Sequence, residues 1–203
     1  MNTNEYESVL TYWFGDLKDG LSDALHRNRW FQGGESVDAE IKAKFAALHQ
    51  GIVAGEYAHW LKQDRGILAT VIVLDQFSRN LFRGSKAAFA YDGQGLALAK
   101  EAVARGIDLR LPLDYRLFLY LPYEHSENLQ DQEQCLALMQ GMLEDAHSLE
   151  AQQLVQQYLQ FAEHHYDIIR KFGRYPHRNA VLGRPSRQIE VRYLANEPTR
   201  FGQ

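Results

Sequence analysis

Asp75 and Arg79 are the first residues whose types and spacing suggest chemistry. They lie four residues apart in the polar segment DQFSRN, residues 75–80, directly after the apolar run ILATVIVL. In a helix this spacing places both side chains on one face with Leu68 and Ile72, so the Asp75 carboxylate would be buried. A buried carboxylate cannot stay ionised without a partner, and Arg79 can supply one. The pair could brace helices from inside, or it could form a solvent-accessible site.

A second polar group lies in the segment PYEHSE, which we expect to form a loop. Glu124, His125 and Glu127 offer two carboxylates beside an imidazole, and these are donors that a metal ion could use. Their spacing matches no known metal signature, and such residues more often anchor a loop. We therefore expect neither a metal site nor another cofactor.

His165 lies near the end of the longest expected helix, residues 149–172. At about 100° per residue it shares a face with the apolar residues of that helix, while His164 lies at the edge of the face. It could be a neutral imidazole hydrogen-bonded in the core. It could instead be a ligand or a general acid or base.

A basic segment follows in an otherwise acidic chain. From His164 to Arg192 there are seven Lys or Arg and two acids, a sum of +5, so the rest of the −4 chain sums to −9. Arginine forks bind carboxylates and phosphates, so this segment could hold a phosphorylated ligand. It could instead form a buried network with Asp75 and the two glutamates of the PYEHSE segment. The polar residues concerned are Arg174, His177, Arg178, Asn179, Arg184 and Arg187.

Several known catalytic motifs are absent from the sequence. It has no Gly-rich phosphate loop, no nucleophile elbow, no paired-cysteine zinc site and no HExxH segment. The single cysteine, Cys135, lies in the middle of an expected helix with no obvious activating neighbour, and it excludes an internal disulfide.

Composition indicates one globular domain, residues 1–203. The chain is 45% hydrophobic and 24% charged, and its length is ample for a core. The segment MNTNEYESVL does not resemble a signal peptide, and the longest apolar run is far shorter than the ~20 residues of a membrane span. We expect a cytoplasmic protein that binds no membrane and, given its net charge of −4, no nucleic acid.

Apolar residues recur at helical spacing through nearly the whole chain. The run before Asp75 could also be a buried strand, but helical spacing on both sides favours a helix. Roughly ten helices with short connections indicate an all-α fold of packed antiparallel pairs. The expected helices cover about 6–14, a stretch ending near 31, a helix capped by Ser36, a turn around Trp60, 65–82, a short helix after Ser85, 92–106, 113–121 (ending before Pro122), 130–147, 149–172, a turn around Asn179 and a helix after Ser186.

Five motifs occur in order over nearly the whole chain: YWFG at 12–15, RWF at 29–31, LDQFSRNLFRG at 74–84, LPYEHSE at 121–127 and HHYDIIRKFGRYPHRNAVLGR at 164–184. Together they resemble a largely bacterial family catalogued as domain of unknown function 924. The resemblance implies an all-α fold of the tetratricopeptide-like helical superfamily, without consensus repeats. It implies no established reaction, substrate or cofactor. Ser78 stands where that family usually has proline, and we expect the serine to allow a smoother helix.

Three functions are compatible with these residues. We favour a helical binding protein whose polar site takes an anionic small molecule or peptide group. A hydrolase or transferase acting on a small anionic substrate is the alternative, with a histidine as general base oriented by Asp75 and with possible assistance from a metal. The third function is a scaffold for a protein partner; the oligomeric state is not indicated.

The expected ligand-binding and catalytic residues overlap. For a binding protein and for a scaffold alike, we expect Asp75 and Glu124 to pair with the C-terminal arginines. The ligand-binding candidates are Arg79, Asn80, Glu124, His125, His165, Arg174, His177, Arg178, Asn179 and Arg184, and the catalytic candidates are His165, His125 and Asp75.

Overall fold

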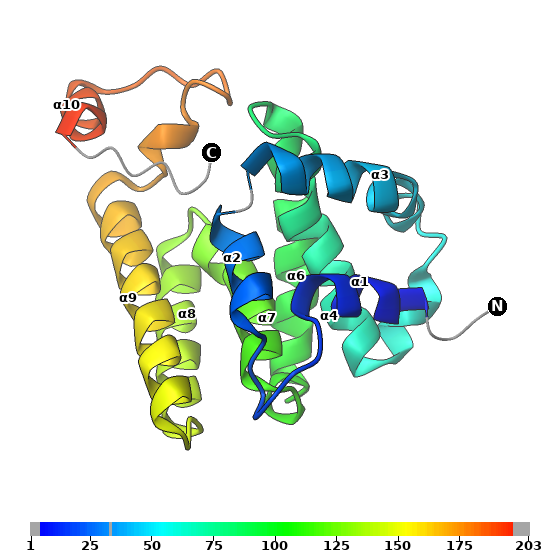
Figure 1. Cartoon of the computed structure of the whole chain (residues 1–203). Coiled ribbons are helices and arrows are strands. Elements are labelled where there is room, and N and C mark those ends of the chain that lie inside the picture. The colour runs from blue at the N-terminus through cyan, green and yellow to red at the C-terminus, as the bar shows by residue number, and fades with distance from the viewer. Residues whose placement is uncertain (1–4, 33, 197–203) are drawn as a thin grey trace.

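The computed structural model describes residues 5–32 and 34–196, and within this part the regular elements are helices (Figure 1). The all-α expectation is therefore confirmed, including the choice of a helix over a strand before Asp75. The α-helices are α1 (Glu5–Phe14), α2 (Ala24–Gln32), α3 (Gly34–Val53), α4 (Asp64–Ile72), α5 (Ser78–Leu81), α6 (Asp92–Ala104), α7 (Leu113–His125), α8 (Leu129–Glu144), α9 (Leu149–Phe172) and α10 (Gln188–Asn196). Short turns of helix are η1 (Ala58–Lys62), η2 (Val73–Phe77), η3 (Lys86–Phe89), η4 (Asp108–Arg110) and η5 (Pro176–Arg178).

Helix α4 lies at the centre of the N-terminal half. Every residue from Gly66 to Ile72 is buried, and the helix packs against α1, α6 and α7. A helix that is apolar on every side has no face for water, so neighbours must surround it. None of the helices in residues 5–32 and 34–196 combines the length and hydropathy that crossing a bilayer requires.

The YWFG and RWF motifs are part of this core. Trp13 of α1 packs edge-on against Phe77 and Phe118, with ring centroids 5.4 and 5.6 Å apart. Trp30 of α2 donates its indole N–H to the Trp13 carbonyl at 2.7 Å and packs against Phe118 at 4.7 Å. These aromatic contacts join α1, α2, η2 and α7, so the two motifs have a packing role.

Helices α7, α8 and α9 run side by side (Figure 1). Because short connections join them in sequence, neighbouring helices run in opposite directions. The end of α7 therefore lies beside the start of α8 and the end of α9, and the chain then turns through Gly173. Gly173 has φ +70°, and its N–H bonds to the Ile169 carbonyl at 2.7 Å, as expected for the residue that ends α9.

The expected helix over residues 65–82 is interrupted by a π-helical turn, η2. Directly after it, the buried Ser78 Oγ lies 3.5 Å from the Val73 carbonyl and 2.8 Å from Nε2 of His49. The chain therefore stays helical through Ser78, although it is less regular there than expected. A π turn widens the helix locally and is frequent at functional sites.

Three expected boundaries were also wrong. Helix α3 begins at Gly34, so Ser36 lies inside it, and α8 ends at Glu144. Helix α7 continues through Pro122 to His125. Proline removes one backbone hydrogen bond of the helix, but Gln132 donates to the Glu124 carbonyl at 2.6 Å and so helps to hold the last turn.

Two helical glycines test the packing of this core. A Cβ at Gly66 would collide with the backbone carbonyl of Trp60, whereas a Cβ at Gly141 would meet nothing within 4 Å. We expect Gly66→Ala to lower the free energy of unfolding by about 1–3 kcal/mol through overpacking. Gly141→Ala should raise it by about 0.5–1 kcal/mol through helix propensity.

Chemical denaturation of the two variants measures both changes. Equal stabilisation by the two alanines would contradict the close approach of α4 to η1.

Candidate functional site

Five charged or titratable side chains from five different elements meet at one end of α7, and we call them the central polar site. Each is buried or half-buried. The π turn contributes one member and α5 the next, while the start of α6, the end of α7 and η5 contribute the others. The members are Asp75, Arg79, Asp92, His125 and Arg178.

Asp75 is the innermost member, with 1% of its side chain exposed. Arg79 Nη1 lies 3.0 Å from Asp75 Oδ1 and donates to the Asp75 carbonyl at 2.7 Å, while Gln76 donates to Oδ2 at 2.6 Å. Burial alone would raise the pKa of Asp75, but Arg79 and His125 lower it well below its ordinary value. The carboxylate is therefore ionised at neutral pH.

His125 is oriented by Asp75. Its Nδ1 lies 2.7 Å from Asp75 Oδ1. Because an ionised carboxylate only accepts hydrogen bonds, Nδ1 must carry the proton. Burial and then Arg79 lower the pKa of His125 although Asp75 opposes them, so the ring is neutral and Nε2 is its basic nitrogen. The side chain is 14% exposed, which gives this pair a route to solvent.

Asp92 is shared by two arginines. Arg79 binds it through two parallel hydrogen bonds, Nη1 to Oδ1 at 2.9 Å and Nη2 to Oδ2 at 3.1 Å. Arg178 Nη1 is 3.7 Å from Oδ2, which is beyond hydrogen-bond distance. Asp92 therefore neutralises Arg79 more fully than it neutralises Arg178.

Arg178 lies between aromatic rings rather than against a carboxylate. Its guanidinium carbon is 4.8 Å from the Phe89 ring centroid and 4.5 Å from that of Tyr175. Nη1 donates to the His125 carbonyl at 3.0 Å, but the buried Nε has no hydrogen-bond partner among the described residues. Burial and the nearby Arg79 lower the pKa of Arg178 to about 10. The cation is thus held in place and only partly neutralised.

Glu124 and His165 form a neutral pair beside this site. Burial and the Asp75 charge raise the pKa of Glu124 to about 8, and burial lowers the pKa of His165 to about 3. The carboxyl Oε1 is 3.4 Å from Nδ1 of His165, which also lies 2.8 Å from the Phe161 carbonyl. Burial and then Arg178 lower the pKa of His177 to about 3 as well.

Glu127 anchors the segment after α9. Arg184 binds both of its oxygens, at 2.5 and 2.9 Å, and the Tyr175 N–H donates to it at 2.8 Å. The Tyr175 hydroxyl in turn donates to the Glu124 carbonyl. These bonds hold the chain that carries Arg178 against the end of α7.

A separate cluster surrounds Glu190 of α10, which is fully buried. Arg174 donates to both of its oxygens at 2.7 Å, and Arg187 Nη2 lies 2.6 Å from Oε1. Asn179 donates to Oε2 at 3.2 Å and accepts from Arg184 at 3.1 Å. These arginines hold their own chain together, as the bracing interpretation of the basic segment predicted.

The expected partners were only partly correct. Glu127 does pair with Arg184, but Asp75 pairs with Arg79 and His125, and Glu124 faces His165, so the expected pairing of these two acids with C-terminal arginines was wrong. His125 lies between Asp75 and η5, so Arg178 of η5 reaches only the backbone carbonyl of His125 and not the Asp75 carboxylate.

Asn80 does not join the site. It donates to Asp38 of α3 at 2.8 Å, and Arg83 binds the same carboxylate. Glu124 and His125 also lie on helix α7 rather than in the expected loop. Within the described ranges no group of three or more His, Cys, Asp or Glu side chains is arranged to hold a metal ion.

Sequence reasoning missed three residues of these polar clusters. Asp92 was read only as the start of a helix, and no spacing marked it as a partner of Arg79. Tyr175 carried no signal either. For Glu190 the sequence did offer a signal, because Glu190 and Asp167 are the two acids in the basic segment. Asp167 is exposed and pairs with Arg170, so Glu190 is the acid that the other arginines surround.

Fold and site together define an all-helical protein with a buried Asp–His–Arg site where five elements meet. The chain belongs to the family described as "Bacterial protein of unknown function (DUF924)", whose model matches residues 9–198, as its motifs predicted. A solved structure of a protein of unknown function from Agrobacterium tumefaciens is similar: it is 30% identical with a TM-score of 0.77, covering 94% of this chain and 97% of that one. No curated protein matches the chain.

The raised pKa of Glu124 predicts a pH dependence of stability. Between its ordinary pKa of 4.5 and about 8, the folded protein holds a proton that the unfolded chain has released. Folding is therefore weakened as pH rises through this window. We expect Glu124→Gln to gain stability over wild type by roughly 1–3 kcal/mol between about pH 5 and pH 8.

Glu127→Gln is the matched control. Burial raises the pKa of Glu127, but Arg184 and the Tyr175 N–H lower it below its ordinary value overall, so this carboxylate is ionised through the whole window. Glu127→Gln should therefore lower the free energy of unfolding by an amount that does not change between about pH 5 and pH 8. Denaturation curves across the pH range measure both, and parallel pH profiles for Glu124→Gln and wild type would contradict a protonated Glu124.

Proposed function

We propose that this protein binds a small molecule or peptide through an anionic group at the central polar site. The observation that carries the proposal is Arg178, a buried cation without a close carboxylate. Its nearest acidic oxygen, on Asp92, is 3.7 Å away and already accepts a hydrogen bond from Arg79. A carboxylate or phosphate of a ligand would provide the charge-assisted hydrogen bonds that Arg178 lacks.

The rings around Arg178 support this role. Phe89 and Tyr175 flank the guanidinium plane and keep it from swinging toward other acids. A guanidinium held in this way loses little conformational entropy when an anion binds. His125 lies beside it with a basic nitrogen, and an anion there would raise the pKa of His125. Binding should therefore strengthen as pH falls toward the ordinary histidine range.

We also infer, from the antiparallel arrangement of α7, α8 and α9, that the helices follow the tetratricopeptide-like superfamily. Short connections and neighbouring antiparallel helices support that inference. The compartment that we propose is the cytoplasm, where the buried thiol of Cys135 would stay reduced. A ligand offered by another protein, such as a peptide carboxylate, fits the same site.

Binding can be tested by calorimetry with inorganic phosphate, acetate, succinate and a short peptide with a free carboxylate. We expect at least one of these anions to bind wild type and to bind Arg178→Gln about tenfold or more weakly, because a charge-assisted hydrogen bond is lost.

Arg83→Gln is the control, because Arg83 is paired with a carboxylate, that of Asp38 of α3, outside the central polar site. It should lower the melting temperature and leave the affinity of the folded protein within about twofold of wild type. Equal affinities of Arg178→Gln and wild type, or no binding of any of the four anions, would contradict the proposal.

A second candidate, a hydrolase or transferase acting on a small anionic substrate, is favoured by the Asp75–His125 pair. Asp75 fixes the proton on Nδ1 and so leaves Nε2 as the basic nitrogen, on the side of the ring away from Asp75. A histidine oriented by a buried carboxylate is the arrangement that general-base catalysis uses. Arg178 would then hold the anionic part of the substrate beside this base.

We expect any hydrolysis of p-nitrophenyl acetate or p-nitrophenyl phosphate by the pure protein to depend on this pair. His125→Gln should remove the activity, and Asp75→Asn should lower it by roughly 100-fold or more, since general-base catalysis typically contributes that much. Steady-state rates at several pH values measure the effect. Unchanged rates in His125→Gln would exclude this histidine as the base, and His165→Gln is the matched control because His165 is enclosed beside Glu124.

A further inference from the structure

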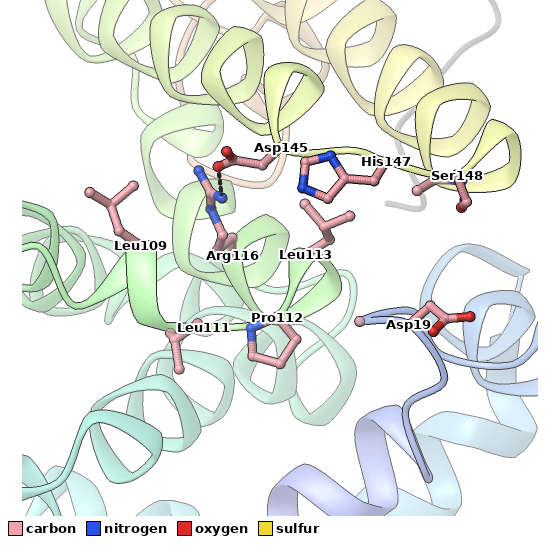
Figure 2. A pocket seen from close by; sticks show the side chains of 11 residues that line it. Asp19, Leu109, Leu111, Pro112, Leu113, Arg116, Asp145, His147 and Ser148 are labelled. Atoms are coloured by element: carbon pink, nitrogen blue, oxygen red, sulfur yellow. Dashed lines mark hydrogen bonds and ion pairs between the residues drawn. The ribbon is translucent and has the colours of Figure 1, made fainter.

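An open pocket of about 650 Å³ lies near the opposite end of α7 from the central polar site (Figure 2). It forms where the segment before α7, the connection between α8 and α9, and the turn at Asp19 and Gly20 come together. Its volume is in the range that small-molecule ligands occupy. Arg116, one of its lining residues, precedes His125 by nine residues on α7, a rise of about 13 Å. The pocket is thus a different site.

The pocket contains a buried cation. Arg116 is 5% exposed, and it points toward Asp145 across the pocket wall (Figure 2). Its Nε donates to the Tyr120 hydroxyl at 3.3 Å, and that hydroxyl donates to Asp108 at 2.7 Å. These bonds come from the inner side, so the guanidinium keeps its position whichever anion faces it from the pocket.

The anion that faces Arg116 now is weakly placed. Asp145 Oδ2 is 2.5 Å from Arg116 Nη1, yet the Asp145 side chain is 55% exposed. Asp145 also follows directly after the last residue of α8, where the helix dipole disfavours a negative charge. An exposed carboxylate in that position can turn out into water, and the buried Arg116 would then need another anion as its partner.

Apolar side chains make up much of the rest of the wall, which also includes Asp19 and His147. Leu111, Pro112 and Leu113 line it, and Leu109 lies beside them with 69% of its surface exposed. Across the opening Ser148 begins α9, a helix of 24 residues, and its side chain accepts from the Ala151 N–H at 3.1 Å. The pocket therefore offers a cation on one side, a helix N-terminus on the other and apolar side chains between them.

From this arrangement we propose that the pocket binds a small organic acid with a compact apolar body. The ligand carboxylate pairs with Arg116 in place of Asp145, and the apolar body covers Leu111, Pro112 and Leu113. A carboxylate with no apolar body, or an apolar body with no carboxylate, satisfies only half of the site.

Hexanoate and benzoate are the probes, titrated into the whole protein and followed by calorimetry. Acetate and hexan-1-ol are the two incomplete ligands. We expect either acid to bind at least about tenfold more tightly than acetate or hexan-1-ol, because each of these lacks one kind of contact.

Asp145→Asn gives the sharpest test, because it removes the competing anion and leaves the pocket in place. It should bind hexanoate several-fold more tightly than wild type, a gain that a merely structural ion pair would not produce. Glu101→Gln is the matched control, since Glu101 is equally exposed and pairs with Arg105 on the surface. It should leave the affinity unchanged.

Arg116→Met should lower the affinity about tenfold or more if the variant folds, as judged by circular dichroism. If it does not fold, the Asp145→Asn result decides alone. The proposal is overturned if neither acid binds wild type or Asp145→Asn, if Asp145→Asn binds no more tightly than wild type, or if hexan-1-ol binds as tightly as hexanoate.

Discussion

The buried carboxylate of Asp75 is the constraint on which the rest of the site depends. It is 1% exposed and ionised. The fold must therefore surround it with hydrogen-bond donors, because burying an unpaired charge would strongly lower the free energy of unfolding. Arg79 and Gln76 come from the same stretch of chain, and His125 comes from the end of α7. The helix must therefore pass through Pro122 to bring that imidazole within reach.

Burial and one negative charge together set the protonation state of a second carboxyl group in this interior. Burial and the Asp75 charge raise the pKa of Glu124 to about 8, so the two carboxyl groups near the end of α7 differ by one proton at neutral pH. Arg79 pairs closely with both Asp75 and Asp92. Arg178 is therefore left 3.7 Å from Asp92, beyond hydrogen-bond distance. The chemical character of the site, a fixed cation beside an oriented histidine, follows from that unequal division of charge.

Helical periodicity was enough to predict the all-α fold and the Asp75–Arg79 pair, because residues four apart share a helix face. Charge balance predicted that Glu127 meets an arginine. Neither signal could reveal the π turn or Asp92, since both depend on how α6 docks against η2. Proline suggested an end to α7 because the lost hydrogen bond is visible in sequence, while the tertiary bonds from Gln132 and Tyr175 that hold the last turn are not.

The most direct test of the claim that Asp75 orients His125 is the tautomer of that imidazole, measured by nitrogen-15 NMR at neutral pH in wild type and in Asp75→Asn. We expect wild-type His125 to be neutral with its proton on Nδ1, bonded to Asp75. We also expect the proton to move to Nε2 in Asp75→Asn, where an amide N–H can donate to Nδ1. A wild-type His125 protonated on Nε2, or identical spectra for the two proteins, would contradict it.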